Sequence, residues 1–255
     1  MTNEHQAAAR PEPAKPENSV IPDVREYGAA RDGVKQVSDK RLFMQLLVFT
    51  GAGEPRTLAQ AVEDAGLETV LYFDANDPRG IGVLLLSEDP ELFTGKARVL
   101  FNAPPFSTLR LRPEFTMMGR TYSLGHEQDL ADWILKKPRR NVTNEATPWH
   151  VWYPLRRKGE FEALPKSEQR PILMEHATIG MAWGAAELAN DVRLACHGLD
   201  TNDNEFVLGI VSKELAWISR LVQDMRKTQQ TSKYIQSMGP FFVGRVFHRT
   251  KGSAA

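Results

Sequence analysis

The chain has 255 residues, 42% of them hydrophobic and 25% charged, which is the composition of an ordinary globular protein. Its 32 basic and 32 acidic side chains cancel, which excludes a broad charged surface for nucleic acid or an anionic membrane. The single cysteine, Cys196, excludes an internal disulfide framework and a multi-cysteine metal site. Because the chain has neither a run of roughly 18 apolar residues nor a signal-peptide core, we expect a cytoplasmic protein without a membrane span.

Residues 1–38 are rich in proline, alanine, glutamate and lysine, and they show almost no apolar periodicity. A segment of this composition cannot bury enough apolar surface to offset the entropy that ordering would cost. We therefore predict a flexible N-terminal arm over residues 1–38, either disordered or draped over the fold or a neighbouring subunit.

The remaining chain divides into two halves, residues 39–137 and residues 138–255, with the same order of elements. In the first half, the apolar pattern predicts strands at 41–49, 69–73 and 82–86, with helices over 55–65 and from 87 onward. In the second half, it predicts strands at 150–155, 192–196 and 205–211, with helices over 167–189 and 213–230. This repeated order predicts an α+β fold in which two ferredoxin-like repeats form one β-barrel with outer helices.

Basic residues flank the predicted aromatic strand of the second half. Arg139 and Arg140 precede this strand, and Arg156 and Arg157 end it, after Tyr153. Guanidinium groups offer paired donors in a fixed fork that suits carboxylates. These clusters therefore indicate either a site for a carboxylate ligand or a solvated basic rim.

His176 lies in the long predicted helix, on a face that it shares with Leu173, Ile179 and Gly180. A lone histidine on an apolar helix face is more often a satisfied core residue than a ligand. Small residues nearby, such as Ala177, would let a flat ligand or a second element approach the helix closely. Periodicity alone leaves both interpretations open.

Several short motifs occur in order along the second half. They are Tyr-Pro-Leu-Arg-Arg-Lys-Gly-Glu at 153–160, Leu-Pro at 164–165, Leu-Met-Glu-His-Ala-Thr-Ile-Gly at 173–180, Gly-Leu-Asp at 198–200 and Gly-Pro-Phe-Phe-Val-Gly at 239–244. Together they resemble the C-terminal half of the coproheme decarboxylases, the decarboxylating branch of the chlorite dismutase superfamily. The resemblance covers residues 138–244 well, whereas over residues 40–137 it is mainly architectural.

The resemblance implies an iron porphyrin held by one protein ligand. It identifies His176 as the proximal metal ligand and Tyr153 as the catalytic residue that carries a radical. The cofactor contacts that it implies are Arg139 and Arg157 at propionates, Leu155 over the ring, and Ser232 or Lys233 at another propionate. A histidine-ligated haem leaves the opposite face of the iron free for peroxide.

The implied activity is the oxidative decarboxylation of coproheme III to protohaem by hydrogen peroxide, with coproheme as both substrate and cofactor. In the family's mechanism, a radical on the tyrosine that corresponds to Tyr153 removes hydrogen from a propionate, and loss of carbon dioxide leaves a vinyl group. The implied partners are the iron porphyrin, hydrogen peroxide and further copies of the chain, because the family commonly forms rings of five subunits.

The distal side departs from the family pattern. Thirteen residues after the proximal histidine, chlorite-degrading members carry an arginine and many decarboxylases a glutamine, but this chain has Ala189. Arg193 lies seventeen residues after His176, so it either reaches the distal pocket through an insertion or faces outward from its strand. Two alternatives to decarboxylation stay open: chlorite dismutation to chloride and oxygen, which needs Arg193, and a haem-binding protein without turnover.

Overall fold

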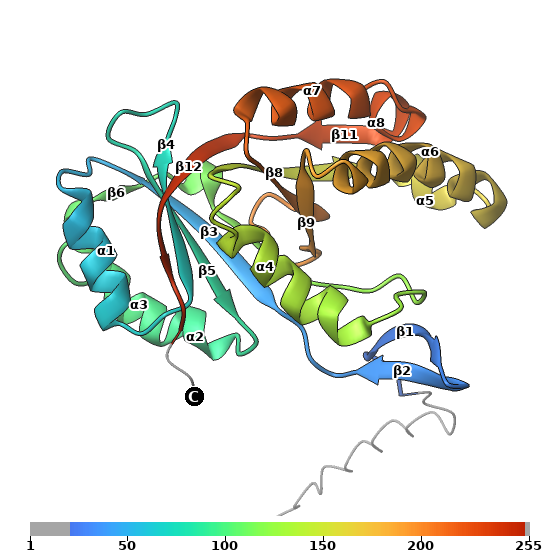
Figure 1. Ribbon diagram of the computed structural model, residues 1–255, viewed down its shortest axis with the longest axis horizontal. Helices are drawn as coiled ribbons and strands as arrows, with labels where there is room; N and C mark the ends of the chain where they lie inside the picture. The colour runs from blue at the N-terminus through green and yellow to red at the C-terminus, as the bar shows by residue number, and fades with distance from the viewer. Residues whose placement is uncertain (1–20, 253–255) are drawn as a thin grey trace, which may run out of the picture.

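Ten strands form one antiparallel sheet in the computed structural model, which describes residues 21–252 (Figure 1). Side chains alternate between the two faces of this sheet, as the two-residue period of a strand requires. In chain order the strands are β3 (Phe43–Thr50), β4 (Thr69–Asp74), β5 (Ile81–Ser87), β6 (Arg110–Leu111), β7 (Met117–Arg120), β8 (Trp149–Arg157), β9 (Asn190–Ala195), β10 (Phe206–Ser212), β11 (Ile235–Met238) and β12 (Phe242–Thr250). A separate hairpin of β1 (Glu26–Arg31) and β2 (Val34–Ser38) precedes them.

The strand order is β10-β9-β7-β3-β5-β4-β12-β8-β11, and β8 also pairs with β10, so the pairing returns to its first strand. Both halves use the same local order, because β3 pairs with β5 and β5 with β4, while β8 pairs with β10 and β10 with β9. The predicted α+β class is therefore confirmed. The finer description, two ferredoxin-like repeats forming one barrel, stays a prediction that these pairings support.

Helices cover the sheet in two groups. The helices are α1 (Pro55–Asp64), α2 (Glu91–Thr94), α3 (Lys96–Phe101), α4 (Lys137–Thr143), α5 (Gly159–Ala163), α6 (Lys166–Ala185), α7 (Leu215–Met225) and α8 (Gln229–Tyr234), and a π-helical turn at Asp132–Lys136 leads into α4. Figure 1 shows α1 to α3 beside the N-terminal strands and α6 to α8 beside the C-terminal strands. Within the described part of the chain, no helix has the length and apolar character needed to cross a membrane.

Buried residues fall into one core on the inner face of the sheet and two cores beneath the helices. Strand β8 contributes side chains to two of these cores. Its Trp152 belongs to the inner core, whereas Tyr153 and Leu155 belong to the core that packs against α6 and α7. The alternation along β8 therefore places Tyr153 on the outer face, beneath the C-terminal helices.

The hairpin differs from the flexible arm that we predicted over residues 1–38. Its strands are joined at Asp32–Gly33, where both φ angles are positive (52° and 80°), and an Asp-Gly pair adopts such a turn readily. The buried Glu26 carboxylate also accepts a hydrogen bond from Arg41 at 3.0 Å, which ties the hairpin to the body of the fold. Residues 1–20 of the predicted arm lie outside the described residues.

The helix predicted over 213–230 is broken into α7 and α8. Thr228 has extended backbone angles (φ −67°, ψ 153°), and its side chain accepts a hydrogen bond from the backbone N–H of Thr231. A threonine hydroxyl that caps a new helix competes with continuation of the preceding one. The break therefore begins α8 at Gln229 and leaves the Thr228 side chain in the space between α6 and α7.

Close packing at Gly209 gives a prediction for stability. A methyl group at Gly209 would lie 2.5 Å from the indole of Trp152, which is fully buried in the inner core. We expect Gly209→Ala to lower the free energy of unfolding by about 1–3 kcal/mol, as overpacking of a core does, and urea denaturation measures this change. Gly53→Ala is the matched control, because nothing lies within 4 Å of the added carbon, and equal losses in both variants would contradict the explanation.

Candidate functional site

The outer face of the C-terminal strands carries a row of three side chains. In the strand register, Leu208 of β10 lies opposite Tyr153 of β8 on one side and opposite Arg193 of β9 on the other. Residues that are directly opposite in a sheet point to the same face. Phe241, just before β12, extends the row, because its ring stacks on that of Tyr153 with 4.4 Å between centroids.

Tyr153 is 5% exposed, and no hydrogen bond joins its hydroxyl to another described residue. Burial raises the pKa of Tyr153 well above its usual value, and the negative charge of Asp191 raises it further, while Arg226 opposes the rise. The phenol therefore keeps its proton at neutral pH. A protonated phenol without a hydrogen-bond partner can give up a hydrogen atom to a group that comes into contact with it.

His176 lies on α6 and is half-buried. Its Nδ1 is 3.1 Å from the hydroxyl oxygen of Thr228, and Nε2 forms no hydrogen bond with the described residues. Burial lowers the pKa of His176, and the positive charge of Arg193 lowers it further, against the opposing charges of Asp191 and Glu175. The imidazole is therefore neutral at neutral pH, which is the form that binds a metal ion.

An ion pair on β9 connects these residues electrostatically. Arg193 Nε lies 3.1 Å from Asp191 Oδ2, and the two side chains share a face because they are two positions apart on a strand. The charge of Asp191 raises the pKa of both Tyr153 and His176. Both the strand residue and the helix residue therefore lie within reach of the charge of Asp191.

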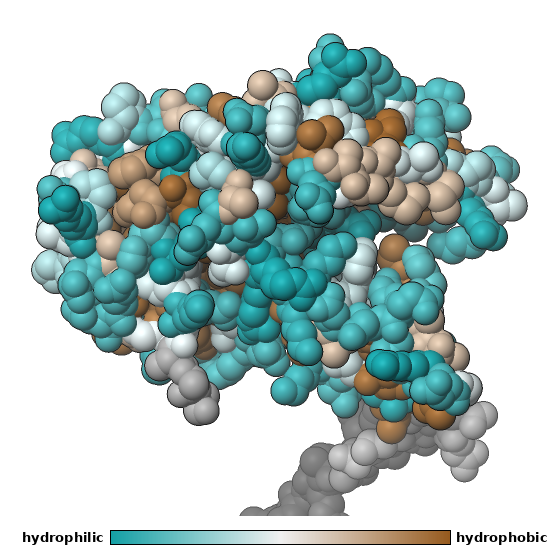
Figure 2. Space-filling model, in the orientation of Figure 1, coloured by the Kyte–Doolittle hydropathy of each residue, from teal (hydrophilic) through white to brown (hydrophobic). Residues whose placement is uncertain are grey.

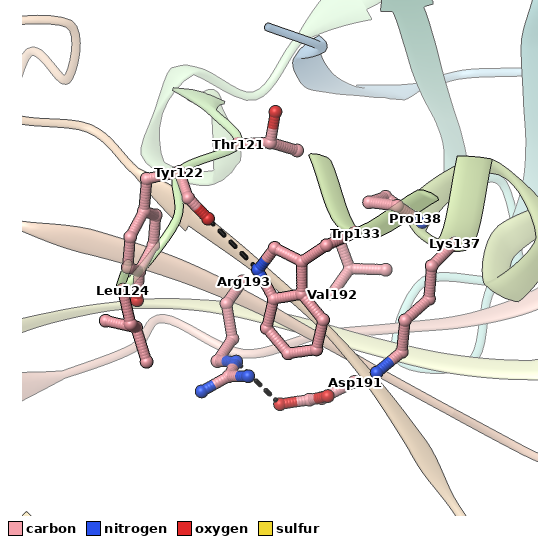
Figure 3. Close-up of a pocket in the computed structure, with 9 residues that line it drawn as sticks. All are labelled: Thr121, Tyr122, Leu124, Trp133, Lys137, Pro138, Asp191, Val192 and Arg193. Atoms are coloured by element: carbon pink, nitrogen blue, oxygen red, sulfur yellow. Dashed lines mark hydrogen bonds and ion pairs between the residues drawn. The ribbon is translucent and has the colours of Figure 1, made fainter. Parts of the chain in front are cut away.

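A pocket opens beside this ion pair (Figure 3). The Arg193 guanidinium lies 5.2 Å from the centre of the Trp133 ring, and Trp133 Nε1 donates a hydrogen bond to the Tyr122 carbonyl at 3.2 Å. The residues that line the pocket are Thr121, Tyr122, Leu124, Trp133, Lys137, Pro138, Asp191, Val192 and Arg193. Burial raises the pKa of Tyr122, so this second phenol is also protonated at neutral pH.

The helix above the sheet face is loosely packed for its length. Of the 20 residues of α6, only Gln169 and Ile172 are buried. Apolar side chains of α6 that reach solvent are Leu173, Met174 and Met181, and Figure 2 shows hydrophobic atoms on the surface where α6 and α7 lie. An exposed apolar surface of this kind is typical of a helix that contacts a ligand or a partner.

These features fit an iron porphyrin. Among residues 21–252, no three or more His, Cys, Asp or Glu side chains lie together as a metal site. A porphyrin iron needs only one protein ligand, such as a histidine. The neutral imidazole suits the iron, the aromatic and aliphatic row of β8 and β10 suits the ring, and nearby arginines suit its carboxylates.

The structure separates the two arginines that the sequence assigns to propionates. Arg139 is held in ion pairs with Glu68 and Glu88 at 3.1 Å, both from the N-terminal half, so it is not brought to the Tyr153 face. Arg157 stays in the C-terminal half at the end of β8, where it pairs with Glu162 at 2.8 Å and Glu205 at 3.3 Å. A propionate at Arg157 would have to displace one of these carboxylates.

The other predicted cofactor contacts lie on β8, on α8 and just after α6. Leu155 is buried on β8, two residues from Tyr153 and on the same face. Ser232 and Lys233 are exposed on α8, and Ser232 Oγ donates a hydrogen bond to the carbonyl of Thr228 at 2.8 Å. Ala189 is 3% exposed beneath α6 and offers only a methyl group, so Arg193, not Ala189, presents a polar group to the site.

Sequence reasoning missed Asp191, Tyr122, Trp133 and Thr228. Asp191 carried a usable signal, because a strand residue two positions before Arg193 must share its face. Tyr122 and Trp133 come from the last part of the first half, for which we predicted no element. Thr228 was missed because the helix predicted over 213–230 continued through it.

A family model and several solved structures resemble this chain. The family model described as chlorite dismutase matches residues 121–247, and no curated protein sequence matches the chain at a significant level. A haem-binding protein from Thermus thermophilus superimposes with a TM-score of 0.61 at 17% identity, covering 82% of this chain and 91% of that one. A double mutant of the chlorite dismutase from Candidatus Nitrospira defluvii gives a TM-score of 0.61 at 13% identity, covering 81% and 91%. The imidazole complex of that dismutase gives 0.60 at 12% identity, with the same coverage.

Proposed function

Since the chain belongs to the chlorite dismutase-like superfamily, we propose that it binds an iron porphyrin through His176 and converts coproheme III to protohaem with hydrogen peroxide. The observation that carries this proposal is that Tyr153 of β8 belongs to the buried core against which Ile179 of α6 packs, one helical turn beyond His176. In this proposal, the protonated phenol and the neutral imidazole act on the same ligand. The homopentamer that the resemblance implies stays a prediction.

The axial role falls to His176 because its Nε2 has no protein partner among the described residues. When bound, the iron supplies the two-electron chemistry that peroxide drives. The residues of the chain hold and orient the porphyrin. Leu155, Leu208 and Phe241 would offer apolar contacts to the ring, and α6 would shield it from water.

Tyr153 is the residue that we assign to hydrogen removal. The phenol is protonated and buried, so after it has been oxidised to a radical it can take a hydrogen atom from the carbon next to the porphyrin ring. Loss of carbon dioxide from the same side chain then leaves a vinyl group. For each propionate, one peroxide accepts two electrons and becomes two water molecules, which balances the oxidation.

Carboxylates of the substrate need cationic partners at the edge of the ring. We assign this role to Arg157, whose present carboxylate partners would be exchanged for a propionate, and to Lys233 on α8; Ser232 is the neutral alternative, which would donate a hydrogen bond instead. Arg139 is left out of this assignment because Glu68 and Glu88 already occupy its guanidinium. Holding each propionate near Tyr153 supplies the close approach that hydrogen transfer requires.

The test of the function is titration of the purified protein with ferric coproheme, followed by stepwise addition of peroxide and chromatography of the porphyrin. We expect a three-propionate intermediate first and protohaem second. Tight binding with bleaching but no conversion would reject decarboxylation and favour a haem-binding protein without turnover. Absence of binding would reject both.

Chlorite dismutation is the second candidate, and the position of Arg193 favours it. Arg193 lies in the row with Tyr153, and its side chain is 35% exposed and pairs with Asp191. A guanidinium there could hold an anion such as chlorite over the iron.

Chlorite added to the haem-loaded protein in an oxygen-electrode cell tests this candidate. If the chain degrades chlorite, Arg193→Gln should lower oxygen release by about 100-fold, the loss typical of removing one preorganised donor. Arg156→Gln is the control, because Arg156 pairs with the exposed Asp203 at the far end of β8 and should have no effect. Equal oxygen release from wild type and Arg193→Gln would remove Arg193 from the reaction, and no oxygen from wild type would remove this candidate.

A further inference from the structure

Among the described residues, the imidazole of His176 forms a hydrogen bond with one hydroxyl group, that of Thr228. Thr228 Oγ1 lies 3.1 Å from His176 Nδ1, and Thr228 is only 1% exposed, so no bulk water competes for this contact. Thr228 lies at the break between α7 and α8, where its side chain also caps α8. Both the backbone and the side chain of this residue are therefore fixed by the local fold.

A threonine hydroxyl has one hydrogen and two lone pairs, and the surrounding atoms decide where each goes. Thr228 Oγ1 lies 2.8 Å from the carbonyl oxygen of Met225, which can only accept a hydrogen bond. The hydroxyl hydrogen is therefore donated to Met225, because two oxygen atoms at that distance without a hydrogen between them would repel. The Thr231 hydroxyl oxygen, at 3.4 Å, is a more distant alternative acceptor than the Met225 carbonyl. The lone pairs are left for the Thr231 N–H at 3.5 Å and for His176.

The histidine must then be the donor in its contact with Thr228. We propose that Thr228 is a positioning residue, which holds the proton of His176 on Nδ1 and leaves the lone pair of Nε2 free to bind a metal. The binding of iron by Nε2 rests on the proposed function, whereas the position of the proton on Nδ1 depends only on the residues of the chain. Partners of this kind orient a ligating histidine and set its tautomer.

The carboxylate of Glu175, the residue before His176, is engaged elsewhere, so the hydroxyl is the group in contact with Nδ1. Glu175 Oε2 accepts a hydrogen bond from the backbone N–H of Gln229 at 2.9 Å, at the start of α8. A carboxylate on Nδ1 would draw the proton away and make the imidazole a stronger electron donor. A hydroxyl that already donates to a carbonyl cannot do this, so His176 is a neutral, moderate donor to the iron.

The first test uses the metal-free protein labelled with ¹⁵N-histidine, at neutral pH. Two-bond ¹H–¹⁵N correlation spectra distinguish a protonated from an unprotonated ring nitrogen, and His176→Gln identifies the signals. We expect a protonated Nδ1 and an unprotonated Nε2 for His176. A proton on Nε2 would overturn the inference, and this measurement on the wild-type chain needs no variant of Thr228 to fold.

The second test compares Thr228→Val, which has no acceptor, with Thr228→Ser, which keeps it. In the ferrous haem-loaded protein, resonance Raman spectroscopy reports the iron–histidine stretching frequency. We expect Thr228→Ser to keep the wild-type frequency and haem affinity, whereas Thr228→Val shifts the frequency and lowers the affinity by about 10–100-fold. Thr178→Val is the matched control, because the exposed Thr178 hydroxyl on α6 donates only to the Met174 carbonyl. An unchanged frequency in Thr228→Val would overturn the inference.

The two tests separate this inference from the proposed function. If Nδ1 carries the proton but no porphyrin binds, the proposed function fails and the role of Thr228 in fixing the tautomer stands. If porphyrin binds through His176 and Nε2 carries the proton in the metal-free chain, the proposed function stands and the role of Thr228 fails.

Discussion

Replacement of Tyr153 by phenylalanine is expected to leave coproheme bound and its propionates intact. The phenylalanine ring keeps the stacking on Phe241, but it has no hydroxyl hydrogen to exchange with the substrate. We expect the rate of protohaem formation to fall by at least about 100-fold, the lower end of what a positioned proton-transferring side chain contributes. Chromatography of the porphyrin after peroxide addition measures the loss.

Folding should be nearly unaffected by this substitution, because no hydrogen bond of the Tyr153 hydroxyl is broken among the described residues. Tyr122→Phe is the control, since Tyr122 is a second protonated phenol, beside the same ion pair but outside the Tyr153 row. It should keep the wild-type rate. Protohaem formation at the wild-type rate by Tyr153→Phe would contradict the assignment of Tyr153, and loss confined to Tyr122→Phe would transfer the role to Tyr122.

Replacement of His176 by alanine is expected to remove the axial ligand. No cluster of metal-binding side chains elsewhere in residues 21–252 can substitute for it. We expect the affinity for ferric porphyrin to fall by at least about 100-fold, since changes to residues that only support a metal ligand already cost 10–100-fold. Absorbance titration with ferric porphyrin gives the affinity, and added imidazole should restore the spectrum of a histidine-ligated iron.

His197→Ala is the matched control for this prediction. His197 is exposed and its ring contacts Phe206 in the same half of the protein, but it faces neither Thr228 nor α6. Its variant should bind porphyrin as the wild type does. If His176→Ala bound porphyrin with unchanged affinity and spectrum, His176 would not be the axial ligand.

Local sequence signals predicted the elements that carry the two central residues. The strand with Tyr153 and the helix with His176 both show a clear apolar period, and the structure places them as β8 and α6. Strand β12 was missed, because charged and polar residues such as Arg245 and Arg249 interrupt its alternation. The first hairpin was missed although its Asp-Gly turn was visible, since the composition around it resembled that of disordered chains.

The predicted arginines show that local sequence signals do not predict contacts between distant segments. Arg139 follows the family spacing, yet its partners Glu68 and Glu88 come from the other half of the chain. Arg193 was ambiguous in the sequence, and the pairing of β9 with β10 places it in the row of Tyr153. Ion pairs and strand registers join residues that are distant in sequence, so the spacing within one motif cannot report them.

By itself, the sequence determined the α+β class, the strand that carries Tyr153 and the apolar helix that carries His176, because each depends on a periodicity within a short segment. Only the tertiary structure decided which groups meet. The register of β8, β9 and β10 joined Tyr153 to Arg193, and a broken helix brought Thr228 to His176 across 52 positions of sequence. These contacts depend on how whole elements pack, and packing is settled only when the full set of side chains is buried together.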